Sequence, residues 1–253
     1  LIYAVLSPFT YFRHDDWIHL GNSVVLLPRD WSLLWRATQF YTPEYEQVWF
    51  FRPFVKLLVY LNYQAFGFFH PMWLASHWAF TLGATYFGAK SITELTGDNK
   101  RSWFFGIAFL TSFHLHFGSI AWVGEGIMNC PQLFYLSLCL YFFVRSMMRH
   151  QTVSFVLSLI FYIVALGFKE SSAFFPLLAA AIAYQKGLIR ENRNRLLIFF
   201  AIFALYLYYR LGVLPFNPGY RPKLSAEGMI IPLASFTSLL SLTGIAAIIL
   251  LRP

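Results

Sequence analysis

Long apolar stretches, separated by short polar connections, constrain this chain more than any other feature of its sequence. The clearest of them cover about residues 72–91, 102–121, 130–148, 152–168, 171–187, 195–213 and 229–251. A bilayer core about 30 Å thick requires roughly 20 apolar residues per crossing, folded so that each segment satisfies its own backbone. We interpret the short apolar run at residues 1–9 as a first helix truncated at its start. The sequence therefore predicts an all-α, polytopic transmembrane helical bundle of about eight spans.

The composition excludes an ordinary soluble domain and argues against a nucleic-acid-binding protein. Hydrophobic residues make up 58% of the chain and charged residues only 12%, with a mean hydropathy of +0.56. A soluble core cannot bury that much apolar surface. The net charge of +8 is spread through the connections instead of forming one basic patch. Membrane lipids are therefore expected as partners and nucleic acid is not.

The basic residues predict the orientation of the bundle. Nine Lys and Arg residues lie in three short connections, Lys90 to Arg101, Arg145 to His150 and Lys186 to Arg195. Short basic connections face the cytoplasm by the positive-inside rule. The first loop, the stretch around Glu125, the Lys169-Glu170 pair and the segment from Arg210 to residue 227 then face the exoplasmic side. We expect a multi-pass protein of a bacterial inner membrane or the endoplasmic reticulum, with this side toward the periplasm or the lumen.

Residues 10–71 are expected to form an exoplasmic loop with juxtamembrane helices. The loop is rich in Trp, which is typical of a membrane interface. Asp30 can cap a short helix whose Trp31 and Leu34 share one face. The apolar segment 53–69 contains Lys56, and a crossing there would invert the three basic connections. We therefore interpret it as an interfacial or re-entrant helix, with a plain spanning helix as the alternative.

Three prolines predict where helices begin or kink. Asn129 as N-cap followed by Pro131 predicts a helix that begins near residue 130. Pro176 and Pro232 fall inside predicted spans and are expected to kink them. Residues 1–253 are treated as one transmembrane module that is truncated in its first span, and an ending in Leu-Arg-Pro is compatible with further sequence after it.

The candidate site residues are the few ionisable groups on the predicted exoplasmic side. Adjacent carboxylates at Asp15 and Asp16 suit a general base or a metal ligand, and the alternative is a solvated loop. Glu125, between two glycines, either approaches a ligand or adds favourable charge to a helix N-terminus. Lys169 and Glu170 bind substrate or simply pair with each other.

Arg210, at the end of an apolar span, either holds a phosphate or extends to the membrane surface. The pattern of His114 and His116 makes a poor metal pair, because residues two apart face different sides of a helix. We expect these two histidines to be polar packing residues.

Four segments, in this order, resemble the GT-C class of membrane glycosyltransferases, and most of all the branch of the protein O-mannosyltransferases and the TMTC-like proteins. They are HDDWIHLGN, FRPFVKLLVYLNYQAFGFFHP, HLHFGSIAWVGEG and KESSAFFPLL, which span about residues 10–215. The chain departs from TMTC-like relatives in having Leu115 after His114, where His-Pro is usual, and Ser76 in the place of an Asn.

The resemblance implies transfer of a sugar from a polyprenyl-phosphate-linked donor to a protein or glycan acceptor at the exoplasmic face. Asp15 or Asp16 would be the base, Glu125 the second acidic motif and Arg210 the group that holds the lipid phosphate. Arg52, Lys169 and Glu170 would bind substrate. Some members use a divalent metal, here through Asp16 and Glu125, and others use none. The departures leave open a non-catalytic membrane subunit of a larger complex. A transporter is disfavoured, because the sequence does not clearly show the ionisable mid-span residues that a transporter is expected to have.

Overall fold

The computed structural model describes residues 12, 14–34, 38–42, 45–50, 52–112 and 123–209. All of them belong to the first of two compact units, residues 1–215, and the second unit, residues 216–253, lies outside the described residues. The predicted first helix at residues 1–9, the span at 229–251 and Pro232 also lie outside them.

Most of the described residues are helical, which confirms the all-α part of the predicted fold class. The helices are α2 (His14–Leu20), α3 (Pro53–Phe66), α4 (His70–Thr96), α5 (Asn99–Ser112), α7 (Val123–Arg149), α8 (Thr152–Leu166), α9 (Phe175–Gln185) and α10 (Ile189–Tyr208). Shorter turns of helix are η2 (Gly21–Leu26), η3 (Trp31–Leu34) and η5 (Glu170–Phe174). The sequence did not predict the antiparallel hairpin of β1 (Thr38–Thr42) and β2 (Tyr45–Phe50) in the first loop.

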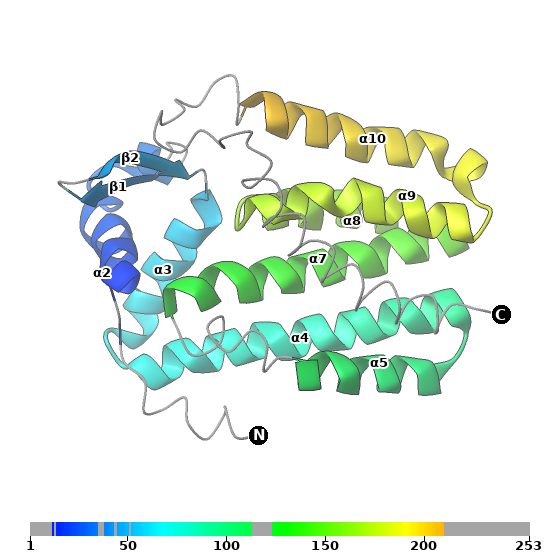
Figure 1. Ribbon diagram of the computed structural model, residues 1–253, viewed down its shortest axis with the longest axis horizontal. Helices are drawn as coiled ribbons and strands as arrows, with labels where there is room; N and C mark the ends of the chain where they lie inside the picture. The colour runs from blue at the N-terminus through cyan, green and yellow to red at the C-terminus, as the bar shows by residue number, and fades with distance from the viewer. Residues whose placement is uncertain are drawn as a thin grey trace, which may run out of the picture. The chain divides into compact units, whose positions relative to one another are not determined.

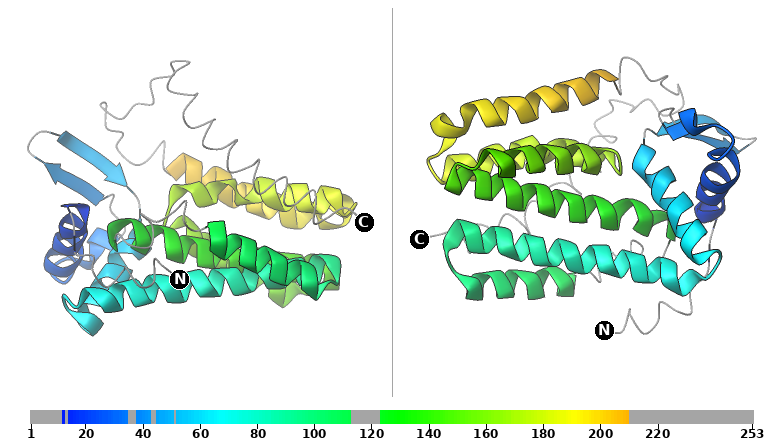
Figure 2. Two further views of the ribbon diagram at one scale, coloured as in Figure 1. Left: turned by 60° about the horizontal axis from the view of Figure 1, so that its bottom comes forward. Right: turned by 180° about the vertical axis from the view of Figure 1, so that it is seen from behind.

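Six helices form a row in which α5, α4 and α7 lie side by side, α8 and α9 both contact α7, and α10 lies beside α9 (Figures 1 and 2). Short turns reverse the chain between them. Gly97 adopts a left-handed φ of 70° and closes α4 with a bond from its N–H to the Thr93 carbonyl, and Gly187, at φ 68°, turns the chain from α9 into α10. Asp98 accepts hydrogen bonds from the first N–H groups of α5. Turns this short make consecutive helices antiparallel neighbours.

As a result, the row of helices has two chemically different ends. The turns α4–α5, α7–α8 and α9–α10, which carry the three basic connections, lie at one end. Arg149 pairs with Glu94 there, and Arg195 donates to the Ser146 carbonyl. The starts of α4 and α7, the α8–η5 connection and the helices α2 and α3 lie at the other end (Figure 1). Residues that the charge pattern assigned to opposite sides of a membrane therefore lie at opposite ends.

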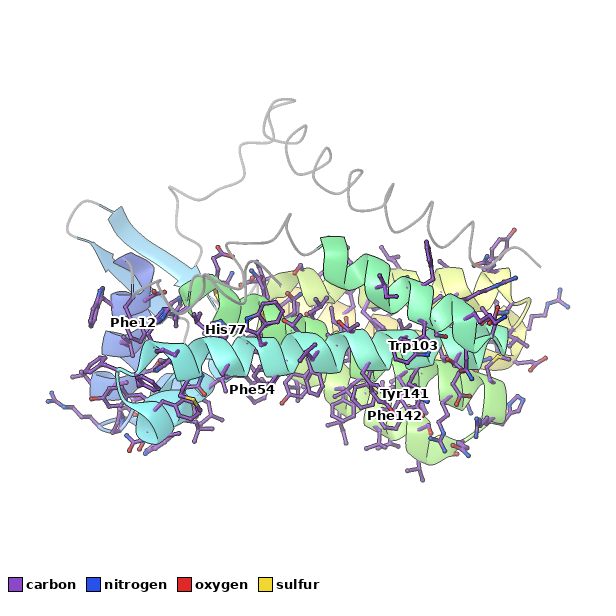
Figure 3. All side chains as sticks on the ribbon, turned by 90° about the horizontal axis from the view of Figure 1, so that it is seen from below. Phe12, Phe54, His77, Trp103, Tyr141 and Phe142 are labelled. Atoms are coloured by element: carbon purple, nitrogen blue, oxygen red, sulfur yellow. The ribbon has the colours of Figure 1, made fainter. Side chains whose placement is uncertain are left out.

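Two apolar cores hold the helices together. Phe143, Tyr162, Phe175 and Phe199 are fully or nearly fully buried where α7 to α10 meet. A second core, with Val55, Val59, Trp73, Leu74 and Ile127, joins α3, α4 and α7 near α2. Figure 3 shows Phe12 at this end and Trp103 toward the opposite one. Phe12 makes edge-to-face contacts with His70 and Trp73, so the second core fixes the elements around the candidate site.

Helix α3 has 14 residues and is about 21 Å long, shorter than a usual crossing. It lies across the end of the row beside α2 and η2 (Figure 1). Its Phe54 N–H donates to the Gly167 carbonyl at 3.3 Å, which ties its first turn to the α8–η5 connection. This placement favours the interfacial interpretation of segment 53–69 over a spanning helix.

Two proline-based expectations were wrong. Helix α7 begins at Val123, well before residue 130, and Pro131 lies inside it. Asn129 is therefore not a cap, because its side chain bonds Glu125 within the helix and Lys169 outside it. Pro176 lies at the first turn of α9 instead of inside a span, where its missing N–H leaves no intrahelical hydrogen bond unmade. The predicted Asp30 cap is present, with Ser32 N–H donating to Asp30 Oδ1 at 2.9 Å.

Among the described residues, α7 is the one helix that is long and apolar enough to cross a membrane by length and composition. Helix α8 is apolar but shorter, at 15 residues. The bundle of about eight spans therefore stays a prediction.

Candidate functional site

Five ionisable side chains and one amide, from four separate segments, converge at the end of the bundle that carries α2 and α3. We call them the polar cluster: Asp16, Arg52, Glu125, Asn129, Lys169 and Glu170. They come from α2, from the residue that precedes α3, from the first two turns of α7 and from the α8–η5 connection. Each of these residues lies near the start or end of a helix.

Asp16 is buried in α2, with 1% of its surface exposed. The expectation of a solvated loop is therefore wrong for this residue. Its Oδ1 accepts a hydrogen bond from the backbone N–H of Gly124, in the first turn of α7. The N–H groups in a helix's first turn have no partner within the helix, so this carboxylate satisfies one of them and lies where the helix dipole favours negative charge.

Gly124 makes this approach possible. A Cβ added at Gly124 would lie 2.8 Å from Asp16 Oδ1 and 3.4 Å from His19 Cδ2. The first of these distances is too short for an unbonded carbon and oxygen, so α2 could not pack this closely against a larger residue. The glycines beside Glu125 predicted the approach of a ligand, whereas in the structure Gly124 accommodates the carboxylate of Asp16.

Glu125, Asn129 and Lys169 form a chain of hydrogen bonds. Asn129 Nδ2 donates to Glu125 Oε2 at 2.7 Å, one helical turn away, and Lys169 Nζ donates to Asn129 Oδ1 at 2.5 Å. The amide of Asn129 therefore fixes both the acid and the ammonium, because it offers one donor and one acceptor. Lys169 does not pair with its neighbour Glu170, so the expected self-contained ion pair is wrong.

Glu170 instead pairs with Arg52, 118 residues earlier in the chain. Arg52 Nε and Nη2 donate to the two carboxylate oxygens at 3.1 and 2.8 Å, and the side chains are 12% and 29% exposed. Arg52 Nη1 also contacts Met128 Sδ at 2.8 Å. A bidentate pair of this kind fixes both the plane and the position of the Arg52 guanidinium group.

Burial and neighbouring charge lower the pKa values of the basic groups around the cluster. Burial, and secondly the charge of Arg52, lowers the pKa of His19 to about 4. Burial lowers the pKa of Lys56, on α3, to about 8. Burial also lowers the pKa of Lys169, although Glu125 opposes that shift, Arg52 adds to it and Glu170 opposes it. These bases lose their protons more easily than they would in water.

A second layer of hydroxyl groups supports η5. Gln132 Nε2 donates to Ser171 Oγ at 2.6 Å and to Ser172 Oγ at 3.0 Å. Ser172 Oγ in turn donates to the Ala165 carbonyl at the end of α8. These bonds tie η5 to α7 and α8, so they hold Lys169 and Glu170 against the start of α7.

Two predicted site residues lie partly or wholly outside the described residues. The backbone of Asp15 lies in α2, but its side chain lies outside what the structure describes. Arg210 follows the last described residue, so its predicted approach to the phosphate site lies outside the described residues. His114 and His116 lie outside them as well.

The described part of the cluster does not fit a divalent metal site. Within it, no group of three or more His, Cys, Asp or Glu side chains could hold a metal ion. The cation Lys169 lies near Glu125, Arg52 lies near His19 of the helix that carries Asp16, and one oxygen of each predicted ligand already accepts a hydrogen bond.

Searches with protein-family models, curated proteins and solved structures give no match to this chain.

Proposed function

We propose that this chain is a multi-pass membrane glycosyltransferase of the GT-C kind. It would transfer a sugar from a polyprenyl-phosphate-linked donor to an acceptor hydroxyl at the exoplasmic face. The observation that carries the proposal is the polar cluster, in which buried Asp16 lies against the turn of α7 that bears Glu125, with Arg52 and Lys169 nearby. Such a transfer requires an acid–base group and cations in one place.

The distribution of side chains supports a membrane-embedded arrangement. Large apolar residues are exposed along the helices of the row, including Trp103 at 74%, Val153 at 73% and Leu205 at 67%. Apolar exposure on this scale is rare on soluble monomers and suits lipid contact. The three basic connections lie at one end and the polar cluster at the other. By the positive-inside rule, the cluster would face the periplasm or the lumen.

The proposed reaction assigns one role to the acids of α2 and another to the cations. The acceptor hydroxyl oxygen attacks the anomeric carbon of the donor sugar, and its proton passes to the carboxylate of Asp16 or Asp15. The bond from the anomeric carbon to the phosphate oxygen breaks, and its electron pair stays on the lipid phosphate. Arg52 and Lys169, joined by Arg210, stabilise that added negative charge.

The surroundings of the cluster suit a substrate that is held at a bilayer edge. Trp17 and Phe68, whose ring centroids lie 6.0 Å apart, are 53% and 58% exposed at this end. Aromatic side chains of this kind favour the level of the lipid headgroups. A polyprenyl donor would keep its chain in the bilayer and present its phosphate to the cations of the cluster.

Replacement of Asp15 and Asp16 with Asn tests the proposal. Membranes that contain the variant are assayed for transfer from a polyprenyl-phosphate-linked sugar to endogenous acceptors. We expect the rate to fall about 10²- to 10⁴-fold, the usual effect of removing a general base. Asp30→Asn is the matched control, because Asp30 is an exposed carboxylate in the same loop. An unchanged rate in the double variant would remove the proposed base.

A non-catalytic subunit of a larger membrane complex is the second candidate. The observation that favours it is that Asp16, Glu125 and the Arg52–Glu170 pair already bond within the chain, as a structural network does. This candidate predicts that the protein copurifies with other membrane subunits and has no turnover alone. A purified monomer that transfers sugar would exclude it.

A further inference from the structure

The exposed face of α10 changes from basic to apolar along the helix. Lys186, just before α10, and Arg190 and Arg193 in its first turns are exposed. Arg190 and Arg193 lie three residues apart and so project from the same side of the helix. After Asn194, the exposed positions from Leu197 onward are apolar or aromatic, with Leu197 at 57% and Leu205 at 67%. The stripe from Arg193 to Leu205 is about 18 Å long at the usual helical rise.

The three cations at the start of this stripe differ from Arg101, Arg149 and Lys90 at the same end of the bundle. Arg101 pairs with Asp98, Arg149 pairs with Glu94, and Lys90 lies over the ring of Tyr86 at 5.7 Å. Within the described part of the chain, the side chains of Lys186, Arg190 and Arg193 form no hydrogen bond, ion pair or ring contact. Their charges are therefore available to a partner outside the chain.

We propose that Lys186, Arg190 and Arg193 bind the phosphate headgroup of an anionic phospholipid whose acyl chains lie along the apolar stripe of α10. The charges of the two partners are complementary, and the order of basic and apolar residues along the stripe matches the order of headgroup and chain in a lipid. Tyr184, 76% exposed just before the turn, has the amphipathic ring that favours the headgroup level.

The proposed lipid site is separate from the polar cluster, which lies at the opposite end of the row of helices (Figure 2). It requires that α10 borders the bilayer, but it does not require glycosyl transfer. Anionic lipid at this site would hold the α9–α10 turn at the membrane surface. The positive-inside rule places this end in the cytoplasmic leaflet, where anionic lipids are concentrated.

The test compares binding of two short-chain lipids to the full chain in neutral detergent. Dioctanoyl phosphatidylglycerol and dioctanoyl phosphatidylcholine are each titrated into the protein in separate experiments, and binding is followed by thermophoresis. We expect tighter binding of the anionic lipid. The variant Lys186→Gln/Arg190→Gln/Arg193→Gln should bind it on the order of 100-fold more weakly, since each basic residue near the surface contributes roughly a fivefold factor.

The matched control is Lys90→Gln/Arg101→Gln/Arg149→Gln, which removes the same charge from the same end and should keep most of the affinity. Single variants at Arg190 and Arg193 give a graded series should the triple variant fail to fold. Equal binding of both lipids by the wild type, or equal losses in the two triple variants, would overturn the proposal. Full competition by inorganic phosphate would overturn the lipid assignment in favour of a free-anion site.

Discussion

Asp16 accepts a hydrogen bond from the backbone N–H of Gly124, a residue 108 positions later in the chain. This bond joins α2 to the first turn of α7. The buried carboxylate therefore contacts the residue that directly precedes Glu125. Glu125 is bonded to Asn129, and Asn129 accepts from Lys169. Two acidic motifs that are remote in sequence therefore belong to one hydrogen-bonded region.

Gly124→Ala should disturb that region directly, because the new Cβ would lie 2.8 Å from Asp16 Oδ1. We expect a loss of about 1–3 kcal/mol of folding free energy as α2 is pushed away from α7, together with a marked loss of transfer activity. Thermal unfolding in detergent and the transfer assay measure the two effects.

Gly106→Ala is the control for the same substitution in a helix. Its Cβ would lie 3.5 Å from Thr85 Cγ2, an ordinary contact, so activity should stay near the wild-type value, and stability should be unchanged or rise by up to about 1 kcal/mol because Ala favours a helix more than Gly does. Wild-type activity in Gly124→Ala would show that the close approach of Asp16 to α7 is not needed for function.

Asn129 offers a way to separate the two bonds of its amide. Asn129→Leu should lower stability by about 1–3 kcal/mol, because Glu125 and Lys169 each lose a partner. Asn129→Asp keeps an acceptor for Lys169 but faces Glu125 with a like charge, so it should raise the pKa of one of the two acids. The pH profile of transfer then shifts in the Asp variant alone.

Asn99→Leu, at the exposed start of α5, controls for loss of an amide elsewhere. Identical pH profiles for Asn129→Asp and the wild type would show that a charge at position 129 does not act on a group whose protonation controls transfer.

Two features were predictable from the sequence because both follow from local patterns. They are the helical fold class and the assignment of the connections to one end or the other of the row of helices. Apolar runs mark helices, and short turns force consecutive helices to reverse direction. The basic residues near Arg149 and Arg195 therefore had to lie at one end, and Glu125 and Glu170 at the other. The hairpin of β1 and β2 had no comparable signal, because its pairing lies within a loop read as helical.

Pairing within the polar cluster was not predictable. Lys169 and Glu170 are adjacent in sequence, yet one bonds Asn129 and the other Arg52. Which partner each finds depends on how η5 packs against α7 and the start of α3, and that packing is fixed by contacts far apart in the chain. The start of α7 was misjudged for a similar reason, since Pro131 is a helix-start signal only when tertiary contacts do not extend the helix before it.

The Arg52–Glu170 pair should show strong coupling in a double-mutant cycle. Arg52→Gln and Glu170→Gln each leave one partly buried charge without its partner, and the double variant removes both. We expect a coupling free energy of about 1–3 kcal/mol from thermal unfolding in detergent. The exposed pair Arg101–Asp98 is the control and should couple by less than about 1 kcal/mol. Equal coupling in the two pairs would show that burial does not strengthen the pair.

His19 should make the fold less stable in acid. Its pKa in the folded protein is lowered to about 4, chiefly by burial, while the unfolded chain keeps the ordinary value near 6.5. The unfolded state therefore binds more protons between these values, so stability falls as the pH decreases from about 7 and continues to fall toward 4. The loss should be about 2 kcal/mol by pH 5. Thermal unfolding across this range measures it, and His19→Gln should flatten the dependence because the variant has no proton to bind at that position. A wild-type protein whose unfolding temperature stays constant from pH 7 to 5, with the carboxylates held ionised, would show that the imidazole is accessible to water in the folded state.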